Sequence, residues 1–71
     1  MEGKTEFAVF CIENIASALK LNAEKVYVML AEDTDILETY IIPHCDVLHT
    51  QSRDYIVADI MDVMRRKGLK I

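Results

Sequence analysis

The chain has 71 residues, of which 52% are hydrophobic, two are glycine and one is proline. That length fits a single domain over residues 1–71 and leaves no room for a second. The net charge of −4 makes nucleic acid and anionic membrane surfaces unfavourable partners, so we expect neither.

Residues that break helices are scarce, and good helix formers such as Ala, Leu, Glu and Lys are frequent. This composition favours helix over strand. The sequence therefore predicts an all-α fold, a compact array of four helices.

The first helix is expected to begin after Thr5, as N-cap, and to run to about residue 19 or 20. Phe10 projects among its polar residues, whereas the other apolar residues share one broad face: Phe7, Ala8, Cys11, Ile12, Ile15, Ala16 and Leu19. Phe10 therefore stands out as a candidate contact for a second chain, with burial by the fourth helix or by the C-terminal tail as the alternative.

The middle of the chain predicts two further helices. Asn22 is a suitable N-cap for a helix over roughly residues 23–32. A third helix is expected over residues 36–48, with an apolar face that stays in phase through Val47 and Leu48. Because Pro43 cannot donate a backbone hydrogen bond, this helix should be kinked or broken there.

The fourth helix is expected to begin after Ser52 and to end at Gly68, a natural left-handed stop. Six residues lie at the centres of the apolar stripes of the helices, and we predict them to form the core: Ile12, Ile15, Leu37, Leu48, Ile56 and Ile60.

Two cysteines and two histidines are the plausible metal ligands: Cys11, His44, Cys45 and His49. Their spacing matches no typical zinc site, so we expect neither a metal nor another cofactor. Cys45 and His49 could share a helix face, which leaves a small thiol/histidine enzyme as an alternative. We expect no enzyme, because so small a domain offers little concavity.

The basic C-terminal end leaves a nucleic-acid accessory protein as a second alternative; it contains Arg65, Arg66, Lys67 and Lys70. A cluster of this kind more often marks a solvated helix end. Nothing resembles a signal peptide or a membrane span, which indicates a cytoplasmic protein with reduced thiols.

A polar group near the last turn of the chain offers a candidate site: His49, Thr50, Tyr55 and Asp59. Tyr55 and Asp59 are one helical turn apart and can hydrogen-bond, and His49 could reach either. The group is expected to be either a structural clasp between the last two helices or a small recognition patch.

Three segments and a terminal glycine carry a family resemblance: residues 7–13, residues 46–50, residues 54–60 and Gly68. On them the chain resembles a small bacterial family called domain of unknown function 3791. Pro43 and the lack of glycine in the turn at residues 51–53 depart from the family pattern and leave the shape of the third helix open.

The resemblance implies a bacterial, intracellular protein. Relatives in this family lie beside genes for predicted ADP-ribosyltransferase-like proteins, which implies an antitoxin-like or accessory partner. The sequence as a whole thus predicts a helical protein-interaction module that binds another protein or associates with itself, with a homodimer as one form of self-association.

Overall fold

The computed structural model describes residues 2–71, and within that range the fold is all-α, without a strand. The elements in chain order are α1 (Glu2–Leu19), α2 (Ala23–Val28), the π-helical turns η1 (Met29–Asp33) and η2 (Leu37–Ile41), α3 (Cys45–Leu48) and α4 (Arg53–Arg66). Since α2 continues directly into η1, the described residues form five helical segments. The prediction of all-α structure is confirmed, and the prediction of four helices is wrong.

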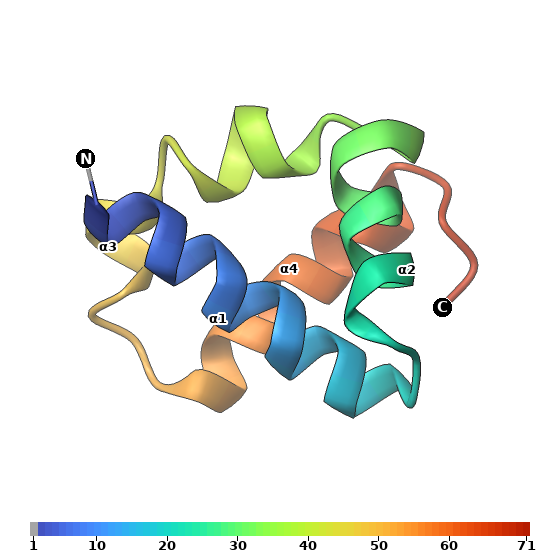
Figure 1. Ribbon diagram of the computed structural model, residues 1–71, viewed down its shortest axis with the longest axis horizontal. Helices are drawn as coiled ribbons and strands as arrows, with labels where there is room; N and C mark the ends of the chain where they lie inside the picture. Colours follow the sequence, from blue (N-terminus) through green and yellow to red (C-terminus); the bar gives the residue numbers. More distant parts are fainter. Residues whose placement is uncertain (1) are drawn as a thin grey trace.

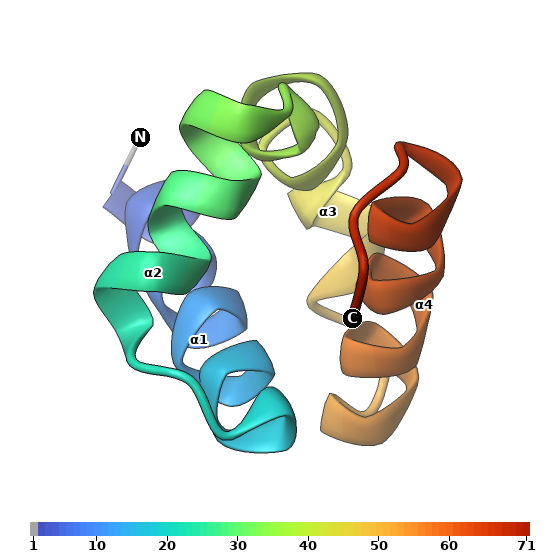
Figure 2. The ribbon, with the colours of Figure 1, turned by 90° about the vertical axis from the view of Figure 1, so that its right-hand side faces the viewer.

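The helices form two opposite sides of the molecule, which we call its walls, and η2 connects them. Figure 2 shows α1 and α2 on one side and α4 on the other, with η2 joining the two sides. Figure 1 shows α3 beside the beginning of α1, so that the short helix closes one end of the molecule.

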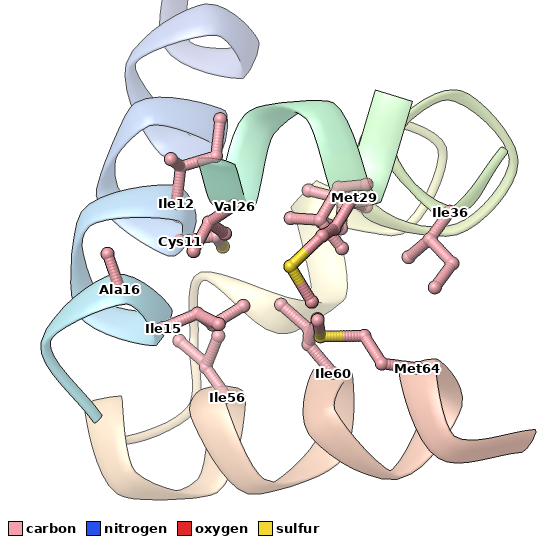
Figure 3. Close-up of a cluster of buried hydrophobic side chains, with 12 residues drawn as sticks. Cys11, Ile12, Ile15, Ala16, Val26, Met29, Ile36, Ile56, Ile60 and Met64 are labelled. Atoms are coloured by element: carbon pink, nitrogen blue, oxygen red, sulfur yellow. The ribbon is translucent and has the colours of Figure 1, made fainter. Parts of the chain in front are cut away.

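The core lies between the two walls. Ile15, Ile56 and Ile60 face one another across the space between α1 and α4, and Met29 and Met64 extend it toward η1 (Figure 3). Of the six predicted core residues, five are buried and Leu37 is only partly buried. The stripes on α1 and α4 were therefore predicted correctly, and the stripe of the third helix only in part.

Two helix starts follow the sequence. The Asn22 side chain accepts a hydrogen bond from the Lys25 backbone N–H at 2.7 Å, and the Ser52 hydroxyl accepts one from the Tyr55 backbone N–H at 3.2 Å. Both N-caps satisfy a backbone donor that the helix leaves free. The predicted cap at Thr5 is wrong, because α1 already begins at Glu2 and nothing before Thr5 disfavours a helix strongly enough to stop it.

The end of α1 is closed by a residue in a left-handed conformation. Among the non-glycine residues that the structure describes, only Lys20 has a positive φ, of 58°. Its N–H donates to the Ser17 carbonyl at 3.3 Å, and the Leu21 N–H donates to the Ala16 carbonyl at 2.9 Å. These two bonds are the Schellman motif.

The same motif closes α4. Gly68 has φ 95° and its N–H donates to the Arg65 carbonyl at 3.0 Å. The Leu69 N–H donates to the Met64 carbonyl at 3.1 Å. The predicted glycine stop is thus confirmed, whereas the lysine at the corresponding place in α1 carries a conformation that suits glycine better.

Pro43 breaks the predicted third helix into η2 and α3. Because proline has no N–H and clashes with the preceding turn, helix stops after Ile41 and begins again at Cys45. The apolar face does not stay in phase across the break. Leu48 is buried as expected, but Val47 is 63% exposed.

The π-helical turn η2 brings together residues that an α-helix would separate. Ile36 and Ile41 lie five positions apart, and both are fully buried. Because a π turn joins residues i and i+5, as in the hydrogen bond from the Ile42 N–H to the Leu37 carbonyl at 3.0 Å, the two isoleucines can face the core together.

Candidate functional site

Phe10 is the most informative of the predicted contact residues. Its ring stacks on Phe7, with centroids 6.1 Å apart and planes 20° apart, and its side chain remains 38% exposed. Phe10 is not among the hydrophobic side chains that pack against the core. The alternative that the chain buries Phe10 within itself is therefore wrong for the residues described.

Asp59 has a different partner from the one predicted. The Tyr40 hydroxyl in η2 donates a hydrogen bond to the Asp59 carboxylate in α4. In the described part of the chain, this carboxylate accepts no hydrogen bond from Tyr55 or His49. The hydrogen bond to Asp59 raises the pKa of Tyr40 to about 12, and burial adds to the shift. Asp59 thus joins η2 to α4.

The other three members of the predicted polar group point elsewhere. The Tyr55 side chain is 53% exposed. The Thr50 hydroxyl donates to the Val47 carbonyl at 2.7 Å, which satisfies the turn after α3. His49 lines a hollow between the beginning of α1 and α3. The predicted clasp of His49, Tyr55 and Asp59 is therefore wrong as a hydrogen-bonded unit, because the break at Pro43 changes the direction of α3.

A hollow of about 280 Å³ separates the beginning of α1 from α3. Its lining residues are Gly3, Lys4, Phe7, Cys45, Asp46 and His49. The structure thus brings Cys45 and His49 to one depression, although the sequence analysis expected little concavity. The Cys45 thiol is 5% exposed and donates a long hydrogen bond to the Asp46 carboxylate at 3.9 Å.

Cys11 is fully buried in the core. Burial raises the pKa of its thiol to about 12, and the neighbouring Cys45 adds to the shift. A thiol of this kind stays protonated and behaves as a small apolar side chain.

The predicted ligand types do not converge on one point. His44 is exposed, its ring lies on Tyr40 with centroids 4.8 Å apart, and its Nδ1 lies 2.8 Å from the Tyr40 carbonyl oxygen. Within residues 2–71, no group of three or more His, Cys, Asp or Glu side chains is placed to hold a metal ion.

Ion pairs occupy part of the basic C-terminal end. Arg66 pairs with Asp62 at 2.7 Å within α4, and Lys67 pairs with Asp35 at 3.3 Å. The contact with Lys67 also lowers the pKa of Asp35. Two of the four basic residues are therefore engaged by carboxylates of the same chain.

A groove between α1 and α4 is the feature that the sequence analysis missed. Its volume is about 350 Å³, and it is lined by Asn14, Ser17 and Ala18 of α1 and by Arg53, Asp54, Val57, Ala58, Met61 and Arg65 of α4. Periodicity could have placed each set on its own helix, but it does not reveal which outer edges of two helices lie next to each other.

Of the helices described, none is long and apolar enough to cross a membrane.

Comparison with known proteins gives one finding. No curated protein and no solved structure matches the chain. A family model described as "Protein of unknown function (DUF3791)" matches residues 6–67, a range that includes all of α4 and most of α1. The chain belongs to that family.

Proposed function

We propose that the chain is a helical protein-interaction module that binds another protein. The observation that carries this proposal is the ring of Phe10, which is 38% exposed on the polar side of α1. Aromatic side chains that become buried at the centre of an interface often dominate its binding energy. Phe10 has the exposure that such an anchor needs, and its contact with Phe7 holds the ring in place before binding.

The finer proposal concerns the kind of partner. The family resemblance supports an accessory or antitoxin-like role beside an ADP-ribosyltransferase-like protein in the bacterial cytoplasm. Such a role needs a binding surface and no catalytic group of its own. We propose no enzymatic activity, no cofactor and no nucleic-acid partner, since the acids Asp35 and Asp62 already pair with two of the basic residues near the C-terminal end.

The test is Phe10→Asp, compared with Tyr27→Asp as a matched control. Tyr27 is 46% exposed on α2, so both changes place a carboxylate at an exposed aromatic position. We expect Phe10→Asp to remain folded by circular dichroism and to lose recovery of the partner from native cells. Tyr27→Asp should remain folded and still recover the partner. Equal recovery with both folded variants would overturn the role of Phe10, and an unfolded Phe10→Asp would show that the ring serves stability.

Self-association is separated from binding to another protein by the mass of the purified chain in light scattering. A monomer that recovers a different protein supports the proposal. A dimer that Phe10→Asp dissociates would replace it with a homodimer whose two-fold interface contains Phe10.

The hollow at Cys45 favours one second candidate, a thiol/histidine enzyme, because Cys45 and His49 line it together. Alkylation by iodoacetamide distinguishes the two functions. A catalytic thiol should react faster than free cysteine, whereas the burial of Cys45 predicts slower reaction. Fast alkylation that His49→Ala abolishes would favour the enzyme.

A further inference from the structure

The groove between α1 and α4 has an apolar floor and small side chains along its edges. Val57 and Met61 are partly buried and pack against the core, so their outer surfaces form the floor. Ser17, Ala18 and Ala58 are small and exposed. Small side chains allow the backbone of another helix to approach closely. The groove is therefore shaped for a partner that brings larger apolar side chains.

Two arginines stand at the ends of the α4 side of this groove. Arg53 and Arg65 are twelve residues apart, which corresponds to about 18 Å along a helix. The Arg53 side chain is 66% exposed; it donates to the Asn14 side chain at 3.4 Å and lies 3.9 Å from Asp54. Among residues 2–71, Arg65 forms no ion pair, in contrast to Arg66. Asp54 also lines the groove, so the lining carries two positive charges and one negative charge, a net positive charge on a chain that is acidic as a whole.

Phe10 extends the same surface along α1. Residues three or four positions apart lie on one side of a helix, and Phe10, Asn14 and Ser17 follow this spacing. The Asn14 side chain donates to the Phe10 carbonyl at 2.7 Å, which fixes it at the edge between the aromatic ring and the groove. The surface therefore runs from an exposed aromatic ring into a groove flanked by arginines.

The charge argues against a second copy of the chain as the occupant. A two-fold interface brings the same patch of both copies together, so two grooves of net positive charge would face each other. Like charges across an interface are costly. An occupant with carboxylates near both arginines would complement the net positive charge, and its pair with Arg65 should be the stronger, because Asp54 already lies 3.9 Å from Arg53.

We propose that this groove binds an amphipathic helix of a different protein, with apolar residues on the floor and acidic residues near both ends of the groove. The apolar stripe packs on Val57, Ala58 and Met61, and the carboxylates pair with Arg53 and Arg65. A groove between two helices accepts a third helix through such a stripe. This inference rests on the proposed function and specifies the chemistry of the partner.

The experiment places a photo-crosslinking amino acid, p-benzoylphenylalanine, at Ala58 on the groove. The control has the same amino acid at Tyr27 on α2, and circular dichroism verifies that both variants fold. After irradiation in native cells, mass spectrometry identifies the crosslinked peptide. We expect Ala58 to crosslink to a segment of another protein with apolar residues three and four positions apart and with flanking Asp or Glu.

A synthetic peptide of that segment is then the probe for a binding titration. Reversal of both charges, Arg53→Glu with Arg65→Glu, should weaken binding at least about tenfold, and Arg→Lys at both positions should weaken it less. Added salt should reduce the affinity of the wild type more than that of the charge-reversed variant.

Several results would overturn the inference. These are a crosslink from Ala58 to a segment without acidic residues, a crosslink to another copy of the chain, or charge reversal that leaves the affinity unchanged. Partner recovery that depends on Phe10 without any crosslink from Ala58 would reject the groove and leave the interaction module in place. If Phe10→Asp also had no effect on recovery, both proposals would fail.

Discussion

The long helices α1 and α4 and the segment between them, residues 23–48, are built in different ways. In α1 and α4 the backbone forms regular turns, and each helix ends in the same pair of Schellman hydrogen bonds. The middle segment combines two π turns with helices of six and four residues. Helices so short are marginal by themselves, and tertiary packing must hold them.

Side chains attach the middle segment to α4. Tyr40 donates a hydrogen bond to Asp59 of α4. Lys67, which directly follows α4, pairs with Asp35 of the middle segment. The Thr34 hydroxyl donates to the Met29 carbonyl at 2.9 Å, which satisfies an acceptor at the end of η1. A regular helix therefore carries its own backbone hydrogen bonds, whereas an irregular segment depends on particular contacts with its neighbours.

The largest expected effect on the free energy of unfolding comes from the loss of packing between the two walls. Ile60 is fully buried, so Ile60→Ala should lower the free energy of unfolding by about 2–5 kcal/mol, as core truncations usually do. Urea denaturation measures this change. Ile41→Ala in η2 should lie at the lower end of that range, because an irregular segment can relax around the cavity. A loss below about 0.5 kcal/mol at Ile60 would contradict the position of the core.

The next effect tests the attachment of the middle segment. Tyr40→Phe removes the hydrogen bond to Asp59 and should cost about 1–2 kcal/mol of unfolding free energy. Tyr55→Phe is the matched control, because its exposed hydroxyl should contribute less than about 0.5 kcal/mol. If Tyr55→Phe cost more than Tyr40→Phe, the clasp predicted from the sequence would hold the helices after all.

The same contact should respond to alkaline pH. The pKa of Tyr40 is about 12 in the folded chain and about 10 in an unfolded one. A raised folded pKa gives stability that is complete below pH 10 and is lost as pH rises from about 10 to 12. The difference in unfolding free energy between wild type and Tyr40→Phe should therefore be constant below pH 10 and shrink between pH 10 and pH 12. A constant difference would contradict the assignment of this hydrogen bond.

The smallest effect compares the two helix ends. Lys20 and Gly68 occupy the same place in the Schellman motif with positive φ. Lys20→Gly should stabilise the fold by about 0.5–1 kcal/mol, and Gly68→Ala should destabilise it by about 1 kcal/mol, because side chains disfavour this conformation. Thermal denaturation of both variants measures the pair. A destabilised Lys20→Gly would show that the lysine side chain has a further role.

The regular parts of the fold could be predicted because their signals are local. Asn22 and Ser52 cap the helices that follow them, Gly68 ends α4, and Ile15 and Ile60 lie on stripes with helical period. The break at Pro43 was predicted, but its consequence for Val47 was not. A helical period applies only while the helix continues, and a π turn changes that period without a residue type that announces it.

The candidate site was less accessible from the sequence. Asp59 was identified, but its partner Tyr40 lies nineteen residues earlier in the chain and meets it only through the fold. The exposure of Phe10 followed from its position on α1. The groove beside it needs the relative placement of two helices that are far apart in the sequence, and nothing local in either helix specifies that placement.

The π turns also indicate where the chain can gain or lose a single residue. A π turn takes up one residue more than an α turn between its hydrogen-bonded groups. Deletion of one exposed residue from η2, such as Glu38 or Thr39, would convert the wide turn into an ordinary one while the chain beyond it continued in the same direction. In related chains, insertions and deletions of a single residue should therefore gather in η1 and η2 and spare α1 and α4.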